Sequence, residues 1–268
     1  MTQVVRLYIT DTLSPGALIA LDEQRAHYVR HVMRLEDDEK ITAFNAENGE
    51  WEASLQSQGK RSVQLVIGTQ VSTPRPCPDV WLAFAAIKNK NELVVEKATE
   101  LGVREIHPIF TRHAVVKSVN IEKLQAHATL AAEQCERHDV PAITTHKNLA
   151  NFLGSHPAGR LLLYGDETGA SAPLFTVIPA PERGSSITRD TPASGPRPPI
   201  KSGVTILIGP EGGFSAEEHR MLQSSTFAIG FGMGPRILRA DTAAVAALAC
   251  VLSAAGDWSQ PPHFKRPS

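Results

Sequence analysis

The chain has 268 residues, of which 42% are hydrophobic and 21% charged, so it is long enough for one large or two ordinary globular domains with a well-buried core. Its formal net charge of −1 excludes a uniformly basic nucleic-acid-binding protein, so any RNA surface must come from local clustering of charge. Three widely spaced cysteines, no apolar run of membrane-spanning length and no signal-peptide core at the start predict a protein of the reducing cytoplasm with no membrane partner.

Residues 1–72 have the pattern of a small β-rich domain with one helix. Asn48 and Gly49 are typical of a hairpin turn. Short segments rich in β-branched residues predict strands over residues 4–9, 17–21, 40–45, 50–56 and 63–69. A helix is predicted over residues 23–35, with an apolar side formed by Tyr28, Val29, Val32, Met33 and Leu35.

The opposite side of this predicted helix carries cationic or potentially cationic groups and no acid. They are His27, Arg30, His31 and Arg34, with Arg25 close by and Arg6 on the first strand. Such a face could contact phosphate, although an ordinary polar face remains an equal alternative. His27 and His31 have helical ligand spacing, but a metal cation would be repelled by the neighbouring arginines, and we predict no metal.

Residues 73–78 contain three prolines in five residues and are predicted to be a semi-rigid linker. Beyond it, residues 79–256 alternate between strands and helices, which predicts an α/β domain with a parallel sheet covered on both faces. Strands are predicted over residues 80–87, 103–110, 141–144, 160–164, 204–208 and 227–231, and helices over residues 91–101, 121–138, 149–153 and 242–255.

Residues 179–202 interrupt this alternation. They contain six prolines, small polar residues and scattered charges, a composition that cannot build a core. We predict a disordered insertion there, in which Arg183, Arg189 and Arg197 either touch RNA or belong to a passive loop. Residues 257–268 are predicted to be a C-terminal tail.

Two strands of the larger domain end in Gly/Pro loops, at residues 209–213 and 232–235, and each loop leads into a helix. Ser215 followed by Glu218 is a capping-box pattern, while Asp241 or Thr242 could cap the last helix, which Gly256 ends. One such loop alone is more often a tight connection, but two at the carboxyl ends of parallel strands favour a ligand site. The residues after these glycines match neither a P-loop nor a G-x-G-x-x-G fingerprint.

Basic residues follow the first two strands of the larger domain and could line an RNA groove, although solvated loops have similar composition. They are Lys88, Lys90 and Lys97, then Arg112, His113 and Lys117. The last helix, by contrast, has no charge after Asp241 and is nearly all small or aliphatic. It is either a core helix or a helix that lies between the sheet and a second subunit.

The loop sequences IGPEGGF and GMGPRILRADTA resemble the paired cofactor loops of SPOUT-class RNA methyltransferases and, more narrowly, the ribosomal RNA small subunit methyltransferase E family. Residues 97–103 and 132–137 also resemble that family. The resemblance implies a parallel SPOUT sheet with a C-terminal trefoil knot, preceded by a PUA-like β-barrel domain. It further implies a homodimer that uses S-adenosylmethionine to form N3-methyluridine in 16S ribosomal RNA of the small subunit.

The loops, the basic clusters and the resemblance together give expected roles to particular residues. Arg236 and Arg239 are the expected catalytic cations, which would stabilise the anion at N3 or hold phosphate. The expected cofactor-binding residues are Glu167, Gly209, Pro210, Glu211, Gly212, Gly213, Met233, Gly234, Arg236, Ile237, Leu238 and Thr242. The expected RNA-binding residues are Arg6, Arg25, His27, Arg30, Arg34, Lys88, Lys90 and Arg112. The chain departs from the family pattern at Asp241, where glutamate is common, and at Met233, where leucine is usual. A non-catalytic RNA-binding protein with a degenerate fold, or a transfer RNA methyltransferase of the same class, remains an alternative.

Overall fold

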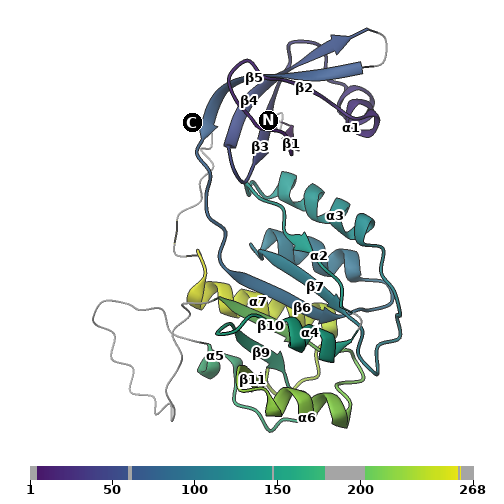
Figure 1. Ribbon diagram of the computed structural model, residues 1–268, viewed down its shortest axis with the longest axis vertical. Coiled ribbons are helices and arrows are strands. Elements are labelled where there is room, and N and C mark those ends of the chain that lie inside the picture. Colours follow the sequence, from purple (N-terminus) through teal and green to yellow (C-terminus); the bar gives the residue numbers. More distant parts are fainter. Residues whose placement is uncertain (1–4, 60–61, 147, 179–202, 259, 261–268) are drawn as a thin grey trace, which may run out of the picture. The chain divides into compact units, whose positions relative to one another are not determined.

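The computed structural model describes residues 5–59, 62–146, 148–178, 203–258 and 260 (Figure 1). The chain forms two compact units, Met1–Pro76 with Ala132–Val140, and Cys77–Ala131 with Pro141–Ser268. The first break lies inside the Pro-rich segment. The sequence analysis gave residues 132–140 to the larger domain, but they group with the first unit, where their backbone carbonyls accept hydrogen bonds from Arg6. The predicted insertion at 179–202, and the tail apart from 257, 258 and 260, lie outside the described residues.

The first unit is built on a five-stranded sheet with the order β1-β3-β4-β5-β2. Its strands are β1 (Arg6–Tyr8), β2 (Leu18–Ala20), β3 (Lys40–Asn45), β4 (Gly49–Gln58) and β5 (Ser62–Ser72). The first of these pairs in parallel with β3, while the other neighbours are antiparallel. The predicted hairpin turn before β4 is confirmed: Gly49 has φ +75°, and a Cβ there would lie 2.2 Å from the Ser72 carbonyl oxygen. The pairing among the described residues leaves β1 and β2 as sheet edges, whereas the sequence analysis expected a barrel.

The helix of the first unit differs from the prediction in its second half. Helix α1 (Glu23–His27) continues into a π-helical turn over Tyr28–Val32, where the Met33 N–H donates to the Tyr28 carbonyl, five residues back, at 2.9 Å. The wider turn changes the angle between successive side chains, so the apolar side expected from an α-helical period is not preserved. Val29 is fully buried, but Val32 and Met33 are 59% and 37% exposed, contrary to the expectation.

The second unit contains a six-stranded, entirely parallel sheet, as predicted, with the order β11-β9-β10-β6-β7-β8. The strands are β6 (Val80–Ala85), β7 (Glu105–Ile109), β8 (Ala142–Ile143), β9 (Leu161–Gly165), β10 (Val204–Ile208) and β11 (Ala228–Phe231). Every residue of β10 is buried, which explains its continuous apolar composition. Since all six strands are parallel, their carboxyl ends meet at one edge of the sheet.

Helices cover both faces of this sheet, which confirms the prediction. On one face α7 (Ala240–Ala255) packs against β6, β10 and α2 (Asn91–Glu100). On the other face α4 (Leu149–Ser155) and α6 (Ala216–Ser224) contribute Phe152 and Leu222 to a core cluster with Leu162 and Leu207 of the sheet. Helix α3 (Ile121–Gln134) stops before the predicted residue 138, near Glu136, which has φ +62°. A short helix that was not predicted, α5 (Leu174–Val177), follows β9.

The predicted capping box of α6 is present in full, because the Ser215 hydroxyl accepts from the Glu218 N–H and the Glu218 carboxylate accepts from the Ser215 N–H. Helix α7 begins earlier than predicted. Arg239 occupies its N-cap position and Asp241 lies in its first turn, so neither Asp241 nor Thr242 is the cap. Among the described residues, no helix combines the length and apolarity needed to cross a bilayer.

Candidate functional site

A cavity of about 320 Å³ lies at the carboxyl ends of β9, β10 and β11. The loops that follow these three strands line it, together with Ala240 and Ala243 of α7. Open parallel sheets place ligands at this edge, where the direction of strand order reverses. Its volume is at the lower end of the roughly 300–1,000 Å³ typical of small-molecule and cofactor sites.

Most residues that the sequence analysis assigned to a cofactor line this cavity. They are Glu167, Gly209, Pro210, Glu211, Gly213, Met233, Gly234, Arg236, Ile237 and Leu238. Thr242 does not line it and is exposed, because α7 begins at Ala240 and so turns Ala240 and Ala243 toward the cavity instead. Gly212 is not among the lining residues either, and packs against the side chain of His113.

The loop after β10 has a shape that needs glycine at specific positions. Gly213 has φ +68°, and a Cβ there would lie 2.2 Å from Glu167 Oε1. At Gly209 a Cβ would come within 3.0 Å of the Phe214 ring. The backbone can therefore approach both the Glu167 carboxylate and the cavity only because these side chains are missing.

Two side chains from other elements hold this loop. Nδ1 of His113 lies 3.1 Å from the carbonyl oxygens of both Gly212 and Gly213. Carbonyl oxygens only accept, so Nδ1 carries the proton in these contacts. Glu218 accepts from the Arg112 N–H at 2.9 Å in addition to its capping-box bond, which ties the start of α6 to the loop after β7.

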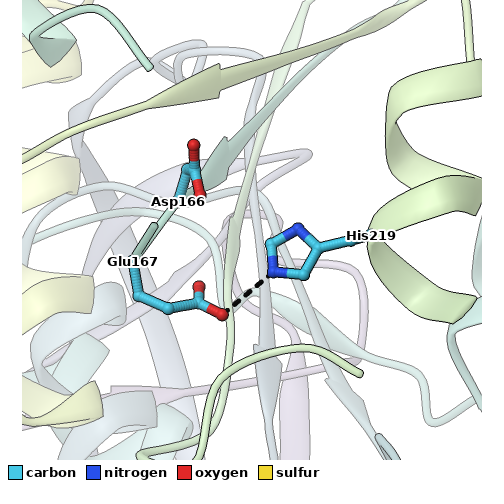
Figure 2. Close-up of side chains that lie close together, drawn as sticks. All are labelled: Asp166, Glu167 and His219. Atoms are coloured by element: carbon cyan, nitrogen blue, oxygen red, sulfur yellow. Dashed lines mark hydrogen bonds and ion pairs between the residues drawn. The ribbon is translucent and has the colours of Figure 1, made fainter. Parts of the chain in front are cut away.

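An acidic group with one histidine lies beside the cavity (Figure 2). The ligand atoms of Asp166, Glu167 and His219 are all within 4.8 Å of one another, a grouping that could hold a metal ion. The carboxylates already accept hydrogen bonds from Ser171, Thr168 and Phe214. Sequence reasoning considered only the His27 and His31 pair as metal ligands and missed this group, since Glu167 and His219 are 52 positions apart.

The cations near the cavity differ in their surroundings. Arg236 is exposed and lines the cavity, whereas Arg239, also exposed, does not line it. Lys90 forms a close ion pair with Asp241, and this hydrogen bond lowers the pKa of the Asp241 carboxyl. Lys88 and Arg112 are exposed at the ends of β6 and β7, as an RNA contact would require.

Arg6 was assigned to RNA binding, and the structure gives it a different role. Its guanidinium donates to the carbonyl oxygens of Ala132 and Glu133, both at 3.1 Å, and pairs with Glu50 at 2.5 Å. The side chain is only 10% exposed. Burial would raise the pKa of Glu50, but hydrogen bonds from His138 and Arg6 lower it to about 2. Arg6 is thus a buried cross-link of the first unit, which makes it unavailable to phosphate.

The other cations of the first unit are only partly available. Arg30 donates to the Leu35 carbonyl and Ser57 hydroxyl and pairs closely with Asp37. Arg34 is exposed and has φ +57°, which turns it away from the helical path. Exposed His27 and half-buried Arg25 complete the set.

Comparison with known proteins identifies the family. Residues 73–252 match the RNA methyltransferase domain family, and residues 21–68 match the RNA methyltransferase PUA domain family. The chain is 32% identical over 248 residues to the ribosomal RNA small subunit methyltransferase E of Rickettsia conorii, covering 92% of this chain and 94% of that one. The chain belongs to the ribosomal RNA small subunit methyltransferase E family. The methyltransferase E of Bacillus subtilis is 26% identical over 238 residues, covering 85% and 87% of the two chains.

Solved structures extend this family likeness to the fold. A methyltransferase from Legionella pneumophila, solved with bound S-adenosylmethionine, is 29% identical, with a TM-score of 0.76 over 94% of this chain and 98% of that one. The methyltransferase E of Neisseria gonorrhoeae, also solved with S-adenosylmethionine, has a TM-score of 0.74 with the same coverage, and at 22% identity it supports the fold alone. In this member of the methyltransferase E family, the two glycine loops and the β9 loop meet around one cavity.

Proposed function

We propose that this protein uses S-adenosylmethionine to methylate N3 of a uridine in 16S ribosomal RNA of the small subunit. The observation that carries the proposal is the cavity at the carboxyl ends of β9, β10 and β11, lined by both glycine loops in a chain of the methyltransferase E family. The Legionella relative, solved with S-adenosylmethionine, supports the choice of cofactor. We also propose that the protein acts in the cytoplasm.

The residues of the cavity suit this cofactor. Ile208, Leu238 and Ala243 offer apolar surface to a flat base, while the loop backbones offer polar groups close to the cavity. Asp166 and Glu167 add negative charge, which favours a positively charged ligand. When bound, S-adenosylmethionine would supply a methyl group on a positively charged sulfur: the uridine nitrogen would bond to the methyl carbon while the carbon–sulfur bond breaks, and S-adenosylhomocysteine would leave.

The protein's own contribution to the reaction is to position the two partners and to stabilise charge. Uridine N3 carries a proton, so the nitrogen becomes negatively charged as that proton leaves, and a nearby cation favours this step. Arg236 is the better placed of the two arginines proposed as catalytic, because it lines the cavity and Arg239 does not. Arg236 would therefore stabilise the developing anion, and Arg239 would hold a phosphate at the start of α7.

The proposal includes RNA contacts in each unit and a second subunit. Arg25, His27 and Arg34 of the first unit, with Lys88 and Arg112 of the second, are the cations we propose for phosphate contact. We also propose a homodimer with the knotted SPOUT topology of the resembled class. Ile237, which lines the cavity, is 92% exposed, and a partner subunit beside the site would cover it.

Methylation of small ribosomal subunits lacking the modification, followed by nucleoside mass spectrometry, tests the function. We expect N3-methyluridine in 16S RNA. Arg236→Ala should lower kcat by about 100-fold, the usual effect of removing one group that stabilises transition-state charge. Arg239→Ala should act mainly by raising KM for RNA, and the effect should depend on salt.

The same experiment separates the alternatives. A product methylated at a ring carbon or at ribose, or found only in transfer RNA, would contradict the proposed specificity. The protein would then be a methyltransferase that acts on a different target. Cofactor binding without methylation of any RNA would instead favour a non-catalytic RNA-binding protein. Equal loss of kcat in Arg236→Ala and Arg239→Ala would remove the distinction between the two arginines.

A further inference from the structure

His219 contacts Glu167, an acid that lines the cavity, but does not line the cavity itself. Glu167 follows β9 and lines the cavity, whereas His219 lies on α6 and does not line it. Figure 2 shows the His219 imidazole directed at the Glu167 carboxylate, and Nε2 of His219 lies 3.0 Å from Glu167 Oε1. The histidine therefore reaches the cavity only through Glu167.

The Glu167 carboxylate is fixed by two donors on one oxygen. Oε1 accepts from the Phe214 N–H at 3.0 Å as well as from His219, so Nε2 must carry a proton. No described residue donates to Oε2, which leaves that oxygen for a ligand. Gly213 allows this arrangement, because a Cβ there would lie 2.2 Å from Oε1. Oε1 thus anchors the side chain to the glycine loop and to α6.

A second carboxylate lies alongside. Asp166 accepts from the Thr168 N–H at 3.0 Å and from the Ser171 hydroxyl at 2.6 Å. Burial would raise the pKa of Asp166, but these hydrogen bonds lower it below its ordinary value, so the group is ionised at neutral pH. The ligand atoms of the two carboxylates and of the His219 imidazole lie within 4.8 Å of one another. Two carboxylates outweigh the single positive charge that one imidazole can carry, so this end of the cavity has a net negative charge.

We propose that His219 is a positioning residue, which holds Glu167 so that the Asp166–Glu167 end of the cavity receives a positively charged group of the cofactor. This inference rests on the proposed use of S-adenosylmethionine, whose sulfonium and amino groups are both cationic. S-adenosylhomocysteine keeps only the amino group, and methylthioadenosine has neither charge. The three ligands therefore separate recognition of charge from recognition of shape.

The test is isothermal titration calorimetry of the full-length protein with these three ligands. Glu167→Gln should weaken S-adenosylmethionine binding by about tenfold, the effect of losing one charge-assisted hydrogen bond, and should leave methylthioadenosine within about twofold. If affinity falls for S-adenosylmethionine alone, the carboxylates receive the sulfonium. If affinity falls for S-adenosylhomocysteine as well, they receive the amino group. Glu217→Gln is the matched control, because this acid lies exposed in the first turn of α6.

Two variants of His219 separate positioning from packing. In His219→Gln the amide nitrogen can take the place of Nε2 as donor, so binding should stay within about twofold of the unmodified protein. His219→Ala removes the donor and should weaken the binding of S-adenosylmethionine by about threefold to fivefold, while the affinity for methylthioadenosine should not change. Thermal melts of both variants check that the fold is retained.

Several results would overturn the inference. Equal losses for charged and uncharged ligands would mean that these residues only shape the cavity, and equal losses in His219→Gln and His219→Ala would exclude the hydrogen bond. Binding of Mg²⁺ or Zn²⁺ to chelator-treated protein, abolished in Glu167→Gln, would make the group a metal site. If the unmodified protein binds none of the three ligands, the proposed function fails. If it binds S-adenosylmethionine and the variants bind equally well, only this inference fails.

Discussion

His107 is a buried histidine of the second unit and His156 a half-buried one, and their surroundings favour the neutral imidazole. Nδ1 of His107 lies 3.2 Å from Nε2 of His146, and its ring contacts those of Trp81 and Phe152. Burial, followed by the nearby charge of His146 and Arg160, lowers the pKa of His107 to about 4. Burial and Arg160 likewise lower the pKa of His156 to about 4. Protonation of either ring therefore opposes the folded state.

These shifts predict a loss of stability in mild acid. In the unfolded chain a histidine has its ordinary pKa of about 6.5, so below that pH the unfolded state binds more protons than the folded state. The free energy of unfolding should be highest above about pH 6.5 and fall as the pH drops toward 4. His107 alone should account for on the order of 3 kcal/mol of this decrease. Urea denaturation at a series of pH values measures this. His107→Asn should flatten the profile between pH 6.5 and 4, whereas Gln223→Asn, at an exposed position of α6 with no titratable group, should leave it unchanged.

Single residues of the site were predictable where a sequence motif carried them. Gly209, Gly213 and Arg236 belong to loops whose glycines and prolines mark them, and they do line the cavity. Arg6 was assigned by its charge alone, and its burial against carbonyls 126 and 127 positions away has no local signal. His219 was missed for the same reason. Long-range partners decide what these side chains do, and one sequence does not contain them.

Among the elements, α6 connects the glycine loop to the rest of the second unit through its first turn. Glu218 is buried and accepts from the Ser215 N–H at 2.8 Å and from the Arg112 N–H at 2.9 Å. Ser215 makes the reciprocal capping bond at 3.3 Å. Since Glu218 satisfies two backbone donors from different segments, it should matter more than the cap residue itself.

Replacing these residues one at a time tests this order. Ser215→Ala should lower the free energy of unfolding by about 1 kcal/mol, the usual effect of losing an N-cap. Glu218→Ala should lower it by about 2 to 4 kcal/mol, because two partly buried N–H groups lose a charged acceptor. Glu217→Ala, at an exposed position of the same turn, should change it by less than about 0.5 kcal/mol. Chemical denaturation measures all three, and a loss in Glu218→Ala no larger than in Ser215→Ala would contradict the proposed link.

The order and type of most elements followed from hydrophobic periodicity and from glycine and proline positions. The parallel sheet of the second unit, its two-sided cover and the capping box of α6 were all predictable in this way. The π-helical turn at Tyr28–Val32 was not, because the same apolar spacing suits an α-helix, and tertiary packing decides between them. The start of α7 was misplaced because Arg239, a residue without capping preference, occupies the N-cap.

For the whole molecule, the outer side of α7 bears on the number of subunits. The buried side of the helix includes Ala244, Ala247 and Leu248 and packs on the sheet. The opposite side carries Ala246, which is partly exposed, and Cys250, which is exposed one helical turn further on. A stripe of small, uncharged side chains on the outer side of a helix lets a second helix approach closely, as is expected at a subunit interface.

We expect the protein to be a dimer in sedimentation-velocity experiments at micromolar concentration, with reducing agent present so that Cys250 cannot cross-link two chains. A double variant, Ala246→Arg with Cys250→Arg, places two positive charges on the stripe, and burying them against their copies would cost more than the contact contributes. The variant should therefore sediment as a monomer and keep its circular dichroism spectrum. Gln223→Arg, at an exposed position on α6, adds charge elsewhere and should remain dimeric. An unmodified protein that stays monomeric over the whole concentration range would contradict the dimer, and a double variant that stays dimeric would move the interface away from α7.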